Sequence, residues 1–180
     1  MNKTGILISP HGGKLVNKVL TAKEASEILK DKSAPSLILD PDTLLDLENI
    51  AHGVYSPLGG FMTEAEFRGA VFKGRLPDDL PWTIPIVLPL KNCSAKKTGK
   101  GSLVLLCNSD NTAIGAAKIR DVYTADIGKA SKYIFGTNNK NPPGVHKFYQ
   151  TGGIFAGGEI MLLSENRYPF HDFNLTPVRE

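Results

Sequence analysis

Apolar residues recur at helical spacing in three segments of the first half of the chain. These segments predict helices that begin just after Thr21, Asp40 and Thr63. A glutamate follows each threonine three residues later, which is the pattern of a capping box. Asp40 precedes a proline, a favoured first residue of a helix. The middle helix is expected to bury one stripe of residues, Leu44, Leu47, Ile50 and Ala51.

Short apolar runs, typical of strands, also occur along the chain and dominate after residue 80. Residues 36–39 form one such run between the first two predicted helices. The runs 103–107 and 112–119 are separated by the polar residues 108–111, so together they predict a β-hairpin.

Proline and glycine interrupt two further strand patterns. Pro85 lies inside the apolar run 83–88 and restricts that run to a sheet edge or a bulge. A last strand is predicted over 154–163, with a kink at Gly157 and Gly158.

The remaining segments are shorter or less regular. Asp126 is expected to cap a helix that runs through Phe135 and ends at Gly136. Residues 137–144 are polar and rich in proline, which predicts a loop. Residues 168–180 carry large apolar side chains without a regular period, so this tail is expected to lie against something else. This expectation favours the interpretation of the chain as a fragment of a longer protein.

Helices mixed with strands come first and strands dominate later, which predicts an α+β fold. We expect a small, partly closed β-barrel with several short helices. The expected domain covers residues 1–167, and residues 168–180 form a tail or linker.

Composition indicates an ordinary globular protein. Hydrophobic residues make up 41% of the 180 residues and charged residues 22%. The net charge of +3 is too small to indicate nucleic-acid binding by itself. The start of the chain is too lightly apolar for an export signal, and the apolar runs are too short to span a membrane. With only Cys93 and Cys107, a cytoplasmic protein with reduced thiols is the expected reading.

Residues 47–62 are the most informative stretch of the chain. Gly53 is expected to close a helix in the left-handed conformation, and Pro57 restricts the residue before it to an extended backbone. Gly59 and Gly60 permit a bend that residues with side chains disfavour. The stretch therefore specifies one backbone path.

This stretch resembles a motif of the N-terminal domain of ATP sulfurylase (sulfate adenylyltransferase), Glu-x-x-Ala-x-Gly-x-x-Ser-Pro-Leu-x-Gly-Phe-Met. Other segments resemble that family in the same order, so the likeness covers nearly the whole chain. They are residues 9–17, 82–88, 119–123, 134–137, 143–145 and 157–158. One departure is Pro142, which stands where the family usually has histidine before Pro-Gly-Val.

The resemblance implies a PUA-like barrel that belongs to an enzyme making adenylyl sulfate and pyrophosphate from ATP and sulfate. In that family the substrates are held by a Gln-x-Arg-Asn-Pro segment and a Gly-Arg-Asp-His-Ala-Gly-like segment of the following domain, and neither occurs here. The resemblance thus implies a non-catalytic domain without catalytic, cofactor or metal residues, inactive alone. ATP and Mg are expected only for the complete enzyme. The expected partners are its catalytic domain and, as an open alternative, further copies of the chain.

Individual residues with chemical potential each have a plainer interpretation. The chain has no Walker-type glycine-rich loop. The segment His11-Gly-Gly-Lys14 is interpreted as a turn in preference to an anion-binding nest. Glu48 and His52 are interpreted as a solvated ion pair on one helix face, in preference to a pair of metal ligands. Ser56 precedes a proline and is interpreted as a turn residue in preference to a nucleophile.

The other candidates lie in loops, in the tail or in a strand. His171, beside Asp172, is interpreted as a surface residue in preference to a catalytic base. Cys107 is expected to be inert core, because it lies in an apolar strand.

A basic cluster supports an alternative of a different class. Its lysines, Lys91, Lys96, Lys97 and Lys100, are interpreted as an exposed loop, and the alternative is a free-standing PUA-like RNA-binding module. No aromatic residues are interleaved with these lysines, which makes the RNA-binding alternative the less favoured one. A third hypothesis is a small enzyme that uses His11 or His52.

Overall fold

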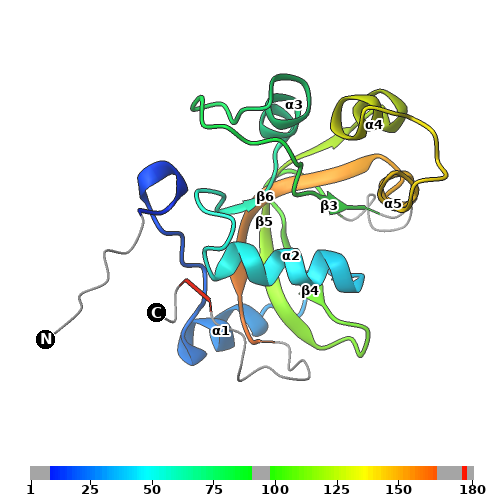
Figure 1. Ribbon diagram of the computed structural model, residues 1–180. Coiled ribbons are helices and arrows are strands. Elements are labelled where there is room, and N and C mark those ends of the chain that lie inside the picture. The colour runs from blue at the N-terminus through cyan, green and yellow to red at the C-terminus, as the bar shows by residue number, and fades with distance from the viewer. Residues whose placement is uncertain (1–8, 91–97, 166–175, 178–180) are drawn as a thin grey trace, which may run out of the picture.

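A mixed six-stranded sheet with helices around it forms the framework of the chain (Figure 1). The computed structural model describes residues 9–90, 98–165 and 176–177. The helices are the 3-10 turn η1 (His11–Gly13), α1 (Ala22–Leu29), α2 (Pro41–Ala51), α3 (Glu64–Lys73), α4 (Ile127–Phe135) and α5 (Pro143–Gln150). The strands are β1 (Ser36–Ile38), β2 (Gly60–Phe61), β3 (Leu88–Pro89), β4 (Leu103–Cys107), β5 (Ala113–Thr124) and β6 (Ile154–Leu162).

The sheet has the strand order β1-β4-β5-β6-β2, and β3 also pairs with β6. Only β1 and β4 are parallel; the other named strand pairs are antiparallel. The predicted α+β class is confirmed, but the described strands form an open sheet and not a closed barrel. Its peripheral strands are two or three residues long, which leaves little backbone to close the sheet.

The predicted helix starts are confirmed by their caps. Thr21 and Thr63 each accept a hydrogen bond from the glutamate three residues on, whose carboxylate bonds back to the threonine. The Asp40 side chain accepts from the backbone N–H of Thr43, and Asp126 caps α4 in the same way. Local sequence therefore determines where these helices begin.

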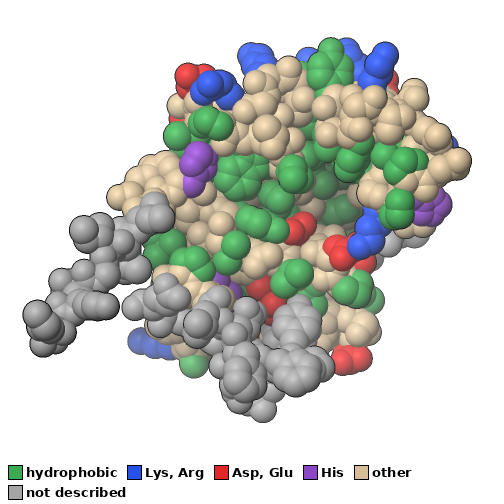
Figure 2. Space-filling view, in the orientation of Figure 1, with side chains coloured by type: hydrophobic (Ala, Val, Ile, Leu, Met, Phe, Trp, Pro, Cys, Tyr) green, Lys and Arg blue, Asp and Glu red, His purple; other side chains and the backbone are tan. Residues whose placement is uncertain are grey.

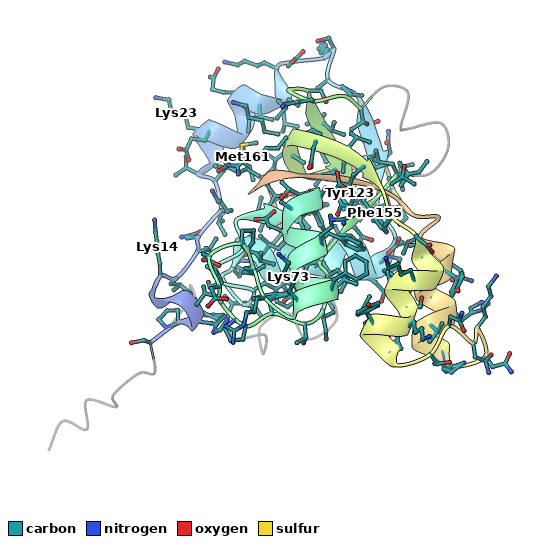
Figure 3. All side chains as sticks on the ribbon, turned by 90° about the horizontal axis from the view of Figure 1, so that it is seen from above. Lys14, Lys23, Lys73, Tyr123, Phe155 and Met161 are labelled. Atoms are coloured by element: carbon teal, nitrogen blue, oxygen red, sulfur yellow. The ribbon has the colours of Figure 1, made fainter. Side chains whose placement is uncertain are left out.

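The core lies between the sheet and the helices that cover it. The predicted stripe of α2 is buried, and α2 packs on β6. Tyr123 of β5 and Phe155 of β6 lie side by side with ring centroids 5.7 Å apart, and Phe67 of α3 packs on both (Figure 3). The Tyr123 hydroxyl donates to the carbonyl of Met62 at 3.0 Å, which satisfies its polar end inside the core.

Two strands approach each other closely at glycine residues. A Cβ atom on Gly60 of β2 would lie 1.8 Å from the carbonyl oxygen of Gly158 in β6. A Cβ on Gly157 would lie 2.5 Å from the backbone of Met62 and Thr63. These glycines are therefore required by contact between backbones, which is a stronger constraint than a flexible turn.

Three local predictions were wrong. Helix α5 begins at Pro143, inside the predicted loop, because proline at the first helical position needs no hydrogen-bond partner. The strand predicted over 83–88 is reduced to β3, Leu88–Pro89. Strand β6 runs without interruption through Gly157 and Gly158, and the irregularity lies opposite them, between Ile119 and Asp121 of β5.

We predict that Gly60→Ala lowers the free energy of unfolding by about 3 kcal/mol, because β2 and β6 must separate to admit the methyl group. Gly59→Ala is the matched control. Its Cβ would come no closer than 3.3 Å to the flexible end of Lys18, so we expect a change below about 1 kcal/mol. Chemical denaturation of both variants measures this difference, and equal losses would contradict the close-approach argument.

Candidate functional site

The two segments with the densest motifs, residues 9–17 and 47–62, lie against each other. The N–H of Val16 donates to the Ser56 hydroxyl at 3.0 Å, and the N–H of Lys18 donates to the carbonyl of Ala51 at 2.9 Å. The carbonyl of Lys18 in turn accepts from Leu162 at the end of β6. Residues 16–18 therefore tie the turn after α2 to the sheet.

A groove of about 530 Å³ lies where these segments meet. Its charged lining comes from Lys14, Lys18, Glu66, Arg120 and Glu159. Lys14 is exposed and extends away from the backbone (Figure 3).

Most of the groove's other charges already have partners within the chain. Arg120 and Glu159 form an ion pair at 2.8 Å, and Glu66 belongs to the capping box of α3. The groove thus offers a positive rim made of two lysines, which suits weak, salt-sensitive contact with an anion.

A second polar group lies on the outer side of α2. The hydroxyl of Tyr55 donates to Asp46 Oδ1 at 3.1 Å and accepts from Asn49 Nδ2 at 3.3 Å. The Tyr55 ring meets Trp82 edge-on, with centroids 6.4 Å apart. This network connects α2 to residues 82–84, because the indole N–H of Trp82 donates to the carbonyl of Ile84 at 2.6 Å.

Burial raises the pKa of Asp46 to about 6. The hydrogen bond from Tyr55 lowers this pKa, and the carboxylates of Asp42 and Asp40 raise it further. Burial also raises the pKa of Tyr55, with the charge of Asp46 as the next cause. At neutral pH, Asp46 is therefore a carboxylate in a place that disfavours its charge.

The structure places the sequence candidates in separate parts of the molecule. His11 lies in η1, where its Nε2 is 3.0 Å from the carbonyl oxygen of Pro81, next to Trp82. Gly12 and Gly13 both have positive φ angles, as the interpretation of this segment as a turn requires.

The expected solvated ion pair of Glu48 and His52 is wrong in one respect, because both side chains are buried. His52 Nε2 lies 3.5 Å from Glu165 Oε1, so this imidazole meets a carboxylate from the end of the described stretch 98–165. Among the described residues, no group of three histidine, cysteine, aspartate or glutamate side chains is placed to hold a metal ion.

The remaining candidates have structural surroundings or lie outside the described residues. The buried Ser56 hydroxyl donates to the carbonyl of Gly53 at 2.7 Å, as the predicted turn role requires. Cys107 is buried in β4, and burial raises the pKa of its thiol. Lys100 lies in an exposed turn. The candidates outside the described residues are Lys91, Cys93, Lys96, Lys97, His171 and Asp172.

Sequence reasoning did not single out Asp46 or Tyr55. One signal was present, because Asp46 stands between two leucines on a predicted amphipathic helix. Tyr55 lies beyond the end of that helix, and only the turn at Gly53 brings its hydroxyl back to Asp46.

Comparison with known proteins gives the class of the chain. A family model of the PUA-like domain matches residues 8–165. The chain therefore belongs to the PUA-like domain family. None of the described helices has the length and apolar character needed to cross a membrane.

Sulfate adenylyltransferases are similar to this chain in sequence. The one from Thermococcus onnurineus is 42% identical over 170 residues, and the one from Pyrococcus abyssi is 39% identical. In both cases the match covers 94% of this chain and 44% of the relative, so the chain spans less than half of their length. The resemblance to the PUA-like N-terminal domain of ATP sulfurylase, predicted from the motifs, is confirmed.

A solved structure is similar as well. A hexameric APS kinase from Thiobacillus denitrificans superposes with a TM-score of 0.74 at 25% sequence identity. The match covers 96% of this chain and 30% of that chain. The domain therefore also resembles part of a protein named as an APS kinase.

We predict that Ser56→Ala lowers the free energy of unfolding by about 1 to 2 kcal/mol, because the Val16 N–H loses its acceptor. Amide hydrogen exchange at Val16 should become faster, which reports directly on this bond. Ser109→Ala, in the exposed hairpin turn, serves as the control and should change neither quantity. Unchanged exchange at Val16 in the Ser56 variant would refute the role of this hydroxyl.

We predict that Asp46→Asn raises the free energy of unfolding at pH 7.5 by about 1 kcal/mol, because a half-buried charge is removed while the acceptor for Tyr55 is kept. The folded-state pKa lies above the unfolded value. The stability that Asp46 contributes is therefore complete below about pH 4 and is lost as the pH rises through about 6. The advantage of the variant should shrink toward pH 4.

Denaturation of wild type and variant at several pH values measures this difference. Asp110→Asn is the control, because this carboxylate lies in the exposed hairpin turn, is not among the charges that act on Asp46, and its loss should not stabilise the fold. A constant advantage of Asp46→Asn at every pH would argue against a perturbed Asp46.

Proposed function

We propose that this chain is the N-terminal, non-catalytic domain of a sulfate adenylyltransferase, and that it packs against and supports the catalytic domain. The reaction of the complete enzyme joins a sulfate oxygen to the α-phosphorus of ATP and releases pyrophosphate. The product is adenylyl sulfate.

The observation that carries this proposal is the pattern of coverage. Sulfate adenylyltransferases match 94% of this chain, whereas the chain accounts for 44% of their length. The remaining length of the relatives is therefore available for the chemistry.

The chemistry of the residues present agrees with this division. Transfer at an α-phosphorus needs several donors that hold the phosphates, usually with a magnesium ion. The sequence has no Walker-type loop. In the groove of about 530 Å³ described above, Arg120 is paired with Glu159, and the other cations of the lining are Lys14 and Lys18. Those two lysines are suited to weak contact with an anion and do not form a cradle for a triphosphate. ATP and Mg are thus assigned to the complete enzyme.

The finer points of the proposal concern boundaries and surroundings. We assign residues 1–167 to the domain and residues 168–180 to a link toward the catalytic domain, and the cytoplasm is the proposed compartment. A homo-oligomer of the complete enzyme is compatible with the hexameric assembly named for the APS kinase relative.

The RNA-binding alternative has less support. Three lysines of its basic cluster lie outside the described residues, and Lys100 alone occupies an exposed turn. Base recognition in single-stranded RNA uses aromatic platforms beside basic residues, and this sequence places none in the cluster.

We predict that the purified 180-residue chain forms no ATP from adenylyl sulfate and pyrophosphate. The reason is that it lacks the donors needed to stabilise charge on the reacting phosphorus. A luminescent ATP assay measures the product, and the longer polypeptide that carries this chain is the positive control. ATP formation by the 180-residue chain alone would overturn the proposed role.

A further inference from the structure

The outer side of α2 presents an unusual mixture of side chains. Asp42, Leu45, Asp46 and Asn49 follow helical spacing on this side, opposite the buried stripe. Leu45 lies in the middle with 46% of its surface exposed. An exposed leucine alone is ordinary, so the neighbours decide what this side means.

Apolar side chains from two other segments extend the surface beyond α2. Ile84 is 63% exposed and follows Trp82, which is held in place by Tyr55. Phe135, at the end of α4, is 41% exposed and lies with Pro85 and Asp46 along a groove of about 360 Å³. Figure 2 shows hydrophobic side chains gathered on one face of the molecule around acidic groups.

We name this surface the α2 docking face. It is defined by Leu45, Asp46, Tyr55, Trp82, Ile84 and Phe135.

Asp46 is the charged centre of the α2 docking face. Its neighbour Asp42 already forms an ion pair with Lys147, and Asp40 caps the helix. Within the described part of the chain, the bond from Tyr55 is the contact that Asp46 makes, and no lysine or arginine pairs with it. A further apolar surface placed over this carboxylate would bury a charge at high cost unless it brought a cation.

These features decide what can cover the face. A second copy in a two-fold arrangement would bring its own Asp40, Asp42 and Asp46 against the same group, and like charges repel. Nucleic acid and anionic lipid carry the same sign of charge and are disfavoured for the same reason. The occupant that fits is an apolar protein surface with one arginine or lysine opposite Asp46.

We propose that the α2 docking face receives the remaining part of the sulfate adenylyltransferase polypeptide, which presents apolar side chains and one basic group to Asp46. This inference rests on the proposed function, because the relatives supply more than half of their length outside the matched region. The basic group pairs with Asp46, and the apolar side chains cover Leu45, Ile84 and Phe135.

Hydroxyl-radical footprinting tests the proposal without any substitution. The modification of Leu45, Trp82 and Ile84 is measured in the 180-residue chain and in the longer polypeptide that carries it. We expect at least a threefold lower modification of these three side chains in the longer polypeptide. Leu29 of α1 is 47% exposed, like Leu45, and should be modified equally in both samples.

A matched pair of substitutions gives a second measurement. Leu45→Lys should lower the melting temperature of the longer polypeptide by several degrees and leave that of the 180-residue chain unchanged. Leu29→Lys, also on an exposed helix side, should change neither temperature.

The outcomes separate this proposal from the proposed function. If the longer polypeptide makes adenylyl sulfate while Leu45 and Ile84 stay fully accessible, the docking face is wrong and the function stands. If it makes none, the proposed function fails and the occupant named here fails with it. Protection that appears in the 180-residue chain at high concentration would assign the face to a second copy, which would also overturn the proposal.

Discussion

The arrangement of the domain depends on the backbone contact between β2 and β6. A Cβ atom on Gly60 would lie against the carbonyl oxygen of Gly158, so β2 has no room for a side chain at this contact. A Cβ on Gly158 would lie against the carbonyl oxygen of Lys118 in β5, on the other side of β6. This contact places the turn after α2 directly on β6, and Met62 then donates its N–H to the carbonyl of Ile86. Because backbone is the limiting atom on both sides, no side-chain rearrangement can relieve a substitution here.

Helix α2 connects that framework to the proposed function. Its inner side fills the core with Leu47 and Ile50, which are fully buried. Its outer side holds Asp46 in a position that costs free energy in the isolated chain. A fold that retains such a carboxylate on an apolar face is typical of a surface completed by another protein segment. The same helix thus stabilises the domain and defines how the domain could be used.

The motif residues are explained chiefly by structure. Val16 bonds to Ser56, and the positive φ angle of Gly53 lets residues 15–16 pass close to the turn. A dense sequence motif is therefore compatible with a purely supporting role, because a fixed backbone path demands specific residues as strictly as catalysis does.

The sequence by itself determined the local features: the capped starts of α1 to α4, the inner stripe of α2 and the hairpin of β4 and β5. These depend on neighbours within a few residues, so their signals are written in short stretches. Helix α5 escaped prediction because Pro143 and Gly144 are equally typical of a loop. Only the tertiary structure decided that the sheet stays open, that Glu48 and His52 are buried, and that Tyr55 meets Asp46. Each of these results from packing between segments far apart in the chain, and no local pattern encodes which distant backbone a residue will meet.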